Sequence, residues 1–380
     1  MARKHALLSA SSAERWINCT PAARLTEKLK DTTSTYAAEG TLAHKIGELK
    51  LYEYLFPSGC YEADWALIKS NELFYAGMID EVSIYTDYVI EQFNEAVQAT
   101  GDPIIFLEER LDFSNYVPEG FGTGDCIIIA DGALEIIDLK FGKGVEVSAE
   151  DNPQLMLYAL GAYEKYGFIY DIQNIKMTIA QVRLGNISSS VISSATLLGW
   201  AEDVVMPAAQ LAFAGEGEQV PGSWCKFCGL KAECKARAEK NLAFVKKYQD
   251  ATITLGLMAA ILDQSGEIVS WISDVTETAL IKALDGEEIP GYKVVEGRSN
   301  RQISDDAALA EILEKETAKP EEIWKPKALQ TITALEKLFS KKRFAELAQA
   351  YIVKPPGKPT LVPNSDKRPA LNSPEDDFDM

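Results

Sequence analysis

One short segment constrains the fold of this chain more than any other, GTGDCIIIADGALEIIDLK at residues 122–140. Two apolar, β-rich runs flank Asp131-Gly132, a dipeptide that strongly favours a two-residue hairpin turn. If these two residues form the turn, Asp125 lies directly opposite Asp138. Like charges at opposed positions destabilise a sheet, so the two facing carboxylates predict a bound divalent cation.

Three further polar residues are placed to join this pair. Lys140 is two residues beyond Asp138 and therefore projects from the same face of the strand. His44 and Glu48 are one turn apart on a helix predicted from about residue 36, so both can face one site. Carboxylates and an imidazole suit Mg²⁺ or Mn²⁺, which can neutralise a phosphate and activate water. Taken singly, each residue fits a solvated strand end or helix surface equally well, and the prediction depends on their combination.

A second group consists of cysteines. Four of the six cysteines are Cys19, Cys225, Cys228 and Cys234, the last three within the ten residues CKFCGLKAEC. The N-terminal residues have no apolar run followed by a cleavage site, so we expect neither export nor disulfides. Four thiolates can hold a zinc ion or an iron–sulfur cluster, and close spacing alone favours zinc as the commoner case.

Composition limits the modes of binding. The chain has 38 Lys and Arg against 57 Asp and Glu, a net charge of −19. Such a chain does not bind nucleic acid through its overall charge, so DNA binding would need a local basic patch or a bound cation. No stretch approaches the roughly 18 consecutive apolar residues that a membrane span needs. We therefore expect a cytoplasmic protein without membrane contact.

Four motifs follow one another in the chain: GTLAHKIGE (40–48), GTGD (122–125), DLK (138–140) and QLMLY (154–158). This ordered series resembles that of the RecB-like branch of the PD-(D/E)XK nucleases. The resemblance implies an α/β fold with a restriction-endonuclease-like core, a mixed central sheet flanked by helices. It implies metal ligation by His44, Asp125, Asp138 and the Leu139 carbonyl, and DNA contact by Gln154 and Tyr158. It makes Lys140 the catalytic lysine, and the other catalytic residues are Asp125, Asp138 and Glu48, which matches an acidic position on the first helix.

The cysteines resemble those of the iron–sulfur members of the same branch, such as AddB and the CRISPR-adaptation nucleases. The segment SASSAERWINCTPAARL around Cys19 is similar to their first-cysteine segment. In these relatives one early and three late cysteines clasp the two ends of the nuclease domain around a [4Fe–4S] cluster. The resemblance thus favours an iron–sulfur cluster, with structural Zn²⁺ as the alternative.

The predicted organisation has three parts. Residues 1–245 form the iron–sulfur nuclease domain, residues 246–352 a mainly helical accessory domain, and residues 353–380 a flexible acidic tail. The tail ends in PEDDFDM, similar to the partner-docking tips of single-strand-binding proteins, so a single-strand-binding or annealing protein is an expected partner besides DNA. A homo-oligomer is also compatible with the sequence.

The whole chain resembles an uncharacterised family of phage and prophage proteins, which implies the cytoplasm of a bacterial host. The expected function is metal-dependent hydrolysis of DNA phosphodiester bonds, as an exonuclease in phage recombination or replication. The main alternative is a non-catalytic DNA-binding or scaffold protein that retains the nuclease fold. An iron–sulfur redox protein is a weaker alternative, because the sequence has no flavin or second-centre motif.

Overall fold

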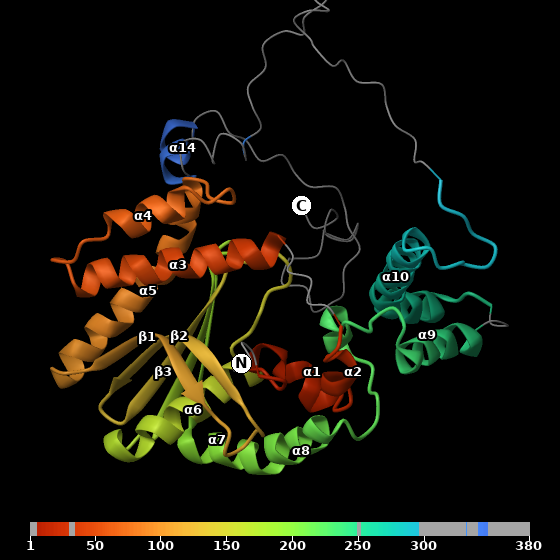
Figure 1. Ribbon diagram of the computed structural model, residues 1–380. Helices are drawn as coiled ribbons and strands as arrows, with labels where there is room; N and C mark the ends of the chain where they lie inside the picture. The colour runs from red at the N-terminus through yellow and green to blue at the C-terminus, as the bar shows by residue number, and fades with distance from the viewer. Residues whose placement is uncertain (1–5, 30–34, 249–251, 296–331, 333–340, 349–380) are drawn as a thin grey trace, which may run out of the picture. The chain divides into compact units, whose positions relative to one another are not determined.

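The computed structural model describes residues 6–29, 35–248, 252–295, 332 and 341–348 (Figure 1). Within them, five strands form one mixed sheet in the order β1-β2-β3-β4-β5. The strands are β1 (Ile104–Asp112), β2 (Phe121–Ala130), β3 (Ala133–Lys140), β4 (Asn174–Gln181) and β5 (Asn186–Ser193). The predicted tail, residues 353–380, lies outside the described residues, as do residues 249–251, 296–331, 333–340 and 349–352 of the predicted accessory domain.

The hairpin between β2 and β3 has the predicted register. Ala130 pairs with Ala133 across the turn, and the ladder continues to Cys126 and Ile137. Asp131 and Gly132 both have positive φ angles, 46° and 72°. A two-residue turn of this type requires positive φ at both central positions, which explains why Asp-Gly specifies it. The predicted turn is therefore confirmed.

Helices cover both faces of the sheet (Figure 1). One layer contains α3 (Thr35–Leu55), α4 (Glu62–Lys69) and α5 (Gly77–Thr100), and α3 and α5 pack on each other. The other face carries α6 (Pro153–Tyr170), which connects the parallel strands β3 and β4. Three elements pack on α6, namely η1 (Ala10–Ser12), α1 (Ala13–Asn18) and α7 (Ser194–Trp200). Beside these lie α2 (Ala22–Thr26), η2 (Ala201–Val205) and α8 (Met206–Ala214).

Side chains that alternate between the two faces of the sheet contribute to a hydrophobic core on each face. Cys126 and Ile128 of β2 are buried with the residues of α3 and α5, whereas Ile127 and Ile129 are buried with those of α6. Successive side chains of a strand point to opposite faces, so one apolar run can serve both cores. A strand that is buried on both faces reads as a continuous apolar run, as IIIA does here.

The chain divides into two compact units, Met1–Ala328 and Leu329–Met380. The first contains the sheet and both helical layers, followed by η3 (Ser223–Phe227), α9 (Lys235–Lys247) and α10 (Leu255–Leu284). The second contains α14 (Lys341–Ala348). None of the helices in the described part of the chain is long and apolar enough to cross a membrane.

The close approach of α6 to β1 depends on Gly161. A Cβ atom at this position would lie 2.9 Å from Cβ of Leu111 and 3.2 Å from the backbone oxygen of Asp112. Gly161→Ala is therefore expected to destabilise the fold by about 1–3 kcal/mol, because neither neighbour can move freely. Gly199→Ala is the matched control, since a Cβ there meets nothing within 4 Å. It should raise stability by up to about 1 kcal/mol through helix propensity. Urea unfolding of both variants measures the difference, and equal effects would contradict the assigned packing.

Candidate metal centre

The candidate centre lies where β2 and β3 stop pairing. Their ladder ends at Cys126 and Ile137, one residue short of Asp125 and Asp138. Instead of backbone pairing, Asp125 Oδ2 accepts a hydrogen bond of 2.7 Å from the backbone N–H of Leu139. The two aspartates thus lie one position beyond the end of the ladder, and Asp125 contacts the residue that follows Asp138. The other carboxylate oxygen of Asp125, Oδ1, faces α3.

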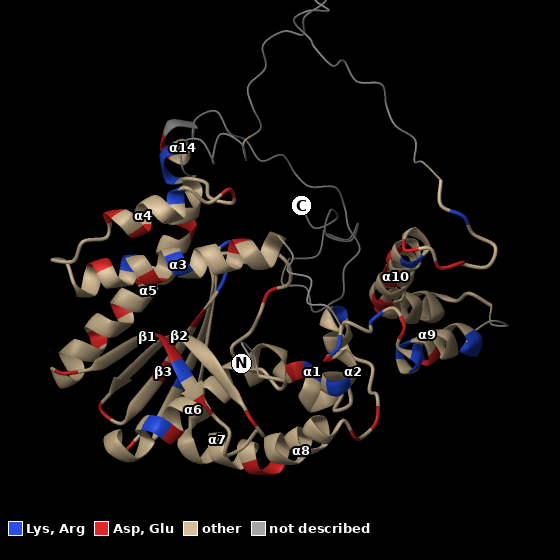
Figure 2. Ribbon diagram, in the orientation of Figure 1, with Lys and Arg blue, Asp and Glu red and all other residues tan. Residues whose placement is uncertain are grey.

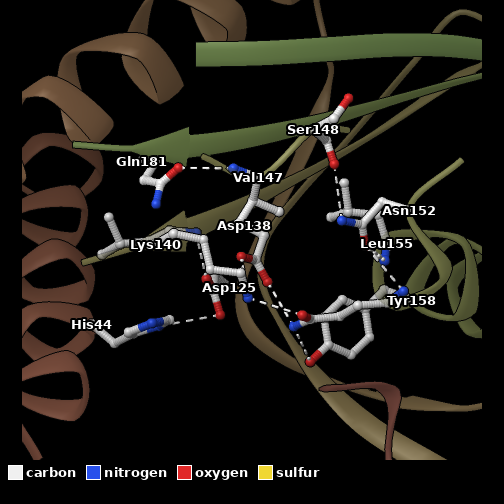
Figure 3. Close-up of polar contacts among 12 residues, drawn as sticks. His44, Asp125, Asp138, Lys140, Val147, Ser148, Asn152, Leu155, Tyr158 and Gln181 are labelled. Carbon is white, nitrogen blue, oxygen red and sulfur yellow. Dashed lines mark hydrogen bonds and ion pairs between the residues drawn. The ribbon is translucent and has the colours of Figure 1, made fainter. Parts of the chain in front are cut away.

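His44 reaches this oxygen from α3. Its Nδ1 lies 3.3 Å from Asp125 Oδ1, and Figure 3 shows the imidazole pointing at that carboxylate. Burial lowers the pKa of His44, but the carboxylates of Asp125, Asp138 and Glu108 outweigh it and raise the pKa to about 9. A site that holds the positive charge of a protonated histidine this strongly is also suited to a metal cation.

Asp138, Lys140 and Gln154 form a closed polar network beside this centre (Figure 3). Lys140 Nζ lies 2.9 Å from Asp138 Oδ2 and donates to Gln154 Oε1 at 2.9 Å. The amide nitrogen of Gln154 donates to Asp138 Oδ1 at 3.0 Å and to the Tyr158 hydroxyl at 3.2 Å. Burial raises the pKa of Asp138, which is 2% exposed, and the Lys140 ammonium opposes that rise.

The start of α6 aims Gln154 into this network. Asn152 caps the helix, accepting hydrogen bonds from the backbone N–H groups of Gln154 and Leu155, and Pro153 occupies the first turn. Such a cap fixes where a helix begins, and therefore which side chains its first turn presents. Gln154 and Tyr158 are one turn apart and meet on that face, as the sequence predicted.

Glu108 of β1 also belongs to the centre, although the sequence did not predict it. Its carboxylate lies 3.9 Å from His44 Nδ1, and ligand atoms of His44, Glu108 and Asp125 all lie within 4.8 Å of one another. Burial raises the pKa of Glu108 to about 7, and the Asp125 carboxylate adds to the rise. The one signal in the sequence is a pair of glutamates inside the apolar strand segment IIFLEERLDF, which does not show where either points.

Glu48 lies at the margin of the centre. Burial raises its pKa, and it borders a cavity on the α3–α4 side together with Tyr52 and Tyr61. Within the described residues, the group of ligand atoms gathered inside 4.8 Å contains Glu108 and does not contain Glu48. One helical turn along α3 therefore carries Glu48 away from the point that His44 occupies.

The four predicted cysteines lie together around a second small cavity. Cys19, Cys225, Cys228 and Cys234 line it with Trp224, Val220 and Pro221, which bring apolar surface to the thiols. Burial raises the pKa of the Cys19 and Cys225 thiols, and the neighbouring Cys228 and Cys234 thiols raise it further. A cation would reverse this effect, because coordinated thiols lose their protons. By contrast, Cys60 is exposed and Cys126 is buried in the sheet.

The spacing of these thiols bears on what they can hold. In a tetrahedral zinc site with Zn–S bonds of about 2.3 Å, the sulfurs lie roughly 3.8 Å apart. Across the described chain, three ligand atoms gather within 4.8 Å at His44, Glu108 and Asp125, and no three of the cysteines do so. The cavity therefore gathers the four thiols without bringing three of their sulfurs as close together as the ligand atoms of the histidine–carboxylate centre.

Residues beyond the cysteines brace their loop. Lys231, between Cys228 and Cys234, pairs with Asp274 of α10 at 2.8 Å. Arg237 of α9 is fully buried and donates to the Lys231 carbonyl at 2.9 Å and to Asp274 at 2.7 Å. Since a buried charge needs partners, these contacts tie α10 to the cysteine loop.

The fold and its two groups of side chains define the class: a mixed α/β protein with a five-stranded sheet flanked by helices, a histidine–carboxylate centre and a four-cysteine cavity. A protein-family model described as "Protein of unknown function (DUF2800)" matches residues 5–369, and the chain belongs to this family. Among solved structures, the crystal structure of SSO0001 matches with 12% identity and a TM-score of 0.21, over 59% of this chain and 96% of that one. A TM-score of this size supports no inference.

Proposed function

We propose that this protein is a metal-dependent deoxyribonuclease with a PD-(D/E)XK core. One observation carries the proposal: residues from separate motifs, spread over more than a hundred positions, meet at one end of the sheet. His44 comes from α3, Asp125 from β2, Asp138 and Lys140 from β3, and Gln154 from α6. Neither the packing of the cores nor the hairpin requires these polar residues to converge, so a chemical role is the better explanation.

The residues fit a divalent cation. Imidazole nitrogen and carboxylate oxygens suit Mn²⁺ or Mg²⁺, and the Leu139 carbonyl follows directly after Asp138 as the further ligand that the nuclease resemblance implies. When bound, such an ion neutralises charge on a phosphodiester and lowers the pKa of a water nucleophile. Asp125 and His44 would hold the ion, and the Leu139 N–H fixes the orientation of the Asp125 carboxylate.

Lys140 has the geometry of a charge stabiliser. Its Nζ donates a hydrogen bond to the side-chain amide oxygen of Gln154 and forms an ion pair with an Asp138 carboxylate oxygen 2.9 Å away. A fixed ammonium beside the scissile phosphate stabilises the negative charge that develops in the transition state. Gln154 holds both Asp138 and Lys140 and is therefore a positioning residue, supported in turn by the Tyr158 hydroxyl.

The proposed enzyme carries a [4Fe–4S] cluster on Cys19, Cys225, Cys228 and Cys234. Its role is structural, because it joins the N-terminal helices to a loop more than two hundred residues later. The proposed setting is phage DNA recombination or replication in the bacterial cytoplasm, with exonuclease action. Figure 2 shows acidic residues on α3, α4 and α5, so DNA binding would have to use a confined site.

The test is cleavage of end-labelled linear duplex and single-stranded DNA by protein purified without oxygen. Cleavage should require Mg²⁺ or Mn²⁺ and stop when EDTA is added. Circular DNA of the same sequence separates the modes of action, since an exonuclease leaves it intact. Absence of cleavage in both metals with the cluster intact would overturn the proposal and favour a DNA-binding or scaffold protein.

A further inference from the structure

The backbone of β1 is irregular at Glu108. Phe106 stacks on Tyr166 of α6, with ring centroids 4.8 Å apart, and Glu109 accepts a hydrogen bond from the same tyrosine at 3.1 Å. Residues three apart on a regular strand point to opposite faces, yet both of these side chains face α6. The alternation of side chains between the two faces of β1 is therefore interrupted between these residues. The interruption lies at Glu108, whose φ angle is +49°.

This irregularity is costly for a glutamate. The left-handed conformation costs an L-residue about 1–2 kcal/mol, and glycine would adopt it freely. Leu107 pairs with Cys126 and Glu109 with Gly124, so Glu108 also lies opposite Asp125. Two carboxylates at facing positions repel each other and add to the cost. Strain of this kind is retained where a function depends on it, and a cation between the carboxylates would offset both costs.

The hydrogen bond and ion pair of Asp138 leave the third ligand position beside His44 and Asp125 to Glu108. Neither Asp138 oxygen belongs to the converging group of ligand atoms: one accepts a hydrogen bond from Gln154, and the other lies 2.9 Å from the Lys140 ammonium in an ion pair. The ligand atoms that converge within 4.8 Å come instead from Asp125, Glu108 and His44. Three protein ligands leave roughly three positions of an octahedral ion open for water or a phosphate oxygen.

We infer that His44, Glu108 and Asp125 form a divalent-cation site that assembles without Asp138, with Glu108 as a ligand aimed by its left-handed backbone. The role of the bound ion rests on the proposed nuclease function, but its binding does not. The site suits Mn²⁺ best, because one of its three ligands is an imidazole. It differs from the set implied by the nuclease resemblance, in which Asp138 is a ligand and Glu108 is not.

Mn²⁺ binding to the full chain without DNA tests this inference, measured by calorimetry and by electron paramagnetic resonance. Glu108→Gln keeps the size of the side chain and removes its charge. It should weaken Mn²⁺ binding by at least about tenfold, because even the loss of an outer-shell partner weakens a metal site about 10–100-fold. Glu109→Gln is the matched control. Glu109 is the next residue of the same strand but pairs with Lys165 of α6, so its replacement should leave Mn²⁺ affinity unchanged.

A double variant, Asp138→Asn with Lys140→Met, tests the independence from Asp138. It removes both partners of the ion pair, so the net charge near the site is preserved, and Mn²⁺ should bind as tightly as to the wild type.

Thermal unfolding in EDTA shows whether Glu108→Gln loses metal binding because a ligand is missing or because the fold is destabilised. The melting temperature of Glu108→Gln should be at least that of the wild type, because a facing carboxylate is lost. Unchanged Mn²⁺ affinity in Glu108→Gln, or loss of binding in the double variant, would overturn the inference. Neither result depends on whether DNA is cleaved.

Discussion

Lys140→Ala is expected to lower the rate of DNA cleavage by about a thousandfold while leaving Mn²⁺ binding intact. Removal of one charge-stabilising donor from a preorganised site costs about 10²–10³ in rate, and Lys140 supplies a full charge rather than a dipole. The ammonium repels a cation, so its loss should not weaken metal binding. Single-turnover cleavage of end-labelled DNA and calorimetric Mn²⁺ titration measure the two effects on the same preparation.

The control for this variant is Lys165→Ala. Lys165 lies on α6, is half exposed and pairs with Glu109, away from the candidate centre. Its replacement removes the same charge from the protein and should leave cleavage unchanged. Lys140→Arg adds a second comparison, because it keeps the charge but not the compact ammonium. Equal cleavage by wild type and Lys140→Ala would show that the assigned centre does not perform the reaction.

Removal of Lys140 leaves Asp138 buried without its cation, and such an orphaned carboxylate destabilises a protein by about 3–5 kcal/mol unless it takes up a proton. Unfolding of Lys140→Ala must therefore be measured beside its activity. Asp138→Asn provides the complementary case, since the amide keeps the shape of the side chain. Loss of cleavage in both variants, with folding retained in at least one, assigns the effect to chemistry rather than to stability.

The centre was predictable from sequence where local rules determine geometry. The Asp-Gly turn fixes the β2–β3 register, and that register brings Asp125 near Asp138. The Asn152 cap and helical spacing likewise fix Gln154 and Tyr158 on one face of α6. Each of these relations joins residues within one hairpin or one helix, where backbone geometry leaves few alternatives.

The sequence was less informative where position depends on packing between elements. Helical spacing placed His44 and Glu48 on one face of α3, but only the angle of α3 to the sheet decides which of them meets Asp125. The role of Glu108 could not be predicted, because regular strand alternation would point its side chain to the other face of the sheet. The left-handed backbone at Glu108 changes that direction. Such departures from local rules are expected at functional sites, which makes Glu108 more informative than a regular strand residue.

The cysteine cavity supports the second large prediction. Cys19→Ser is expected to remove the proposed cluster and to lower the stability of the domain that contains the sheet by on the order of 5 kcal/mol. Cys19 and Cys225 are separated by 205 residues, and closing so long a loop restricts the unfolded chain strongly, by the same loop-closure entropy that a disulfide exploits. Without Cys19, a cluster would be held by Cys225, Cys228 and Cys234 alone. One of its irons would lack a cysteine ligand, and the cluster would no longer link the N-terminal helices to the cysteine loop.

Iron and sulfide content of protein purified without oxygen, its visible absorption and its thermal unfolding measure the effect. Wild type should contain about four irons per chain if the four thiols hold a [4Fe–4S] cluster, and one zinc would instead support the structural Zn²⁺ site. Cys60→Ser is the matched control, because Cys60 is exposed and lies apart from the cavity. If Cys19→Ser keeps both its iron and its melting temperature, Cys19 is not a ligand. The contacts of Arg15 and Ser223 across the same junction would then have to hold the N-terminal helices, since Arg15 donates to the Phe227 carbonyl and Ser223 to Glu14 without any cluster.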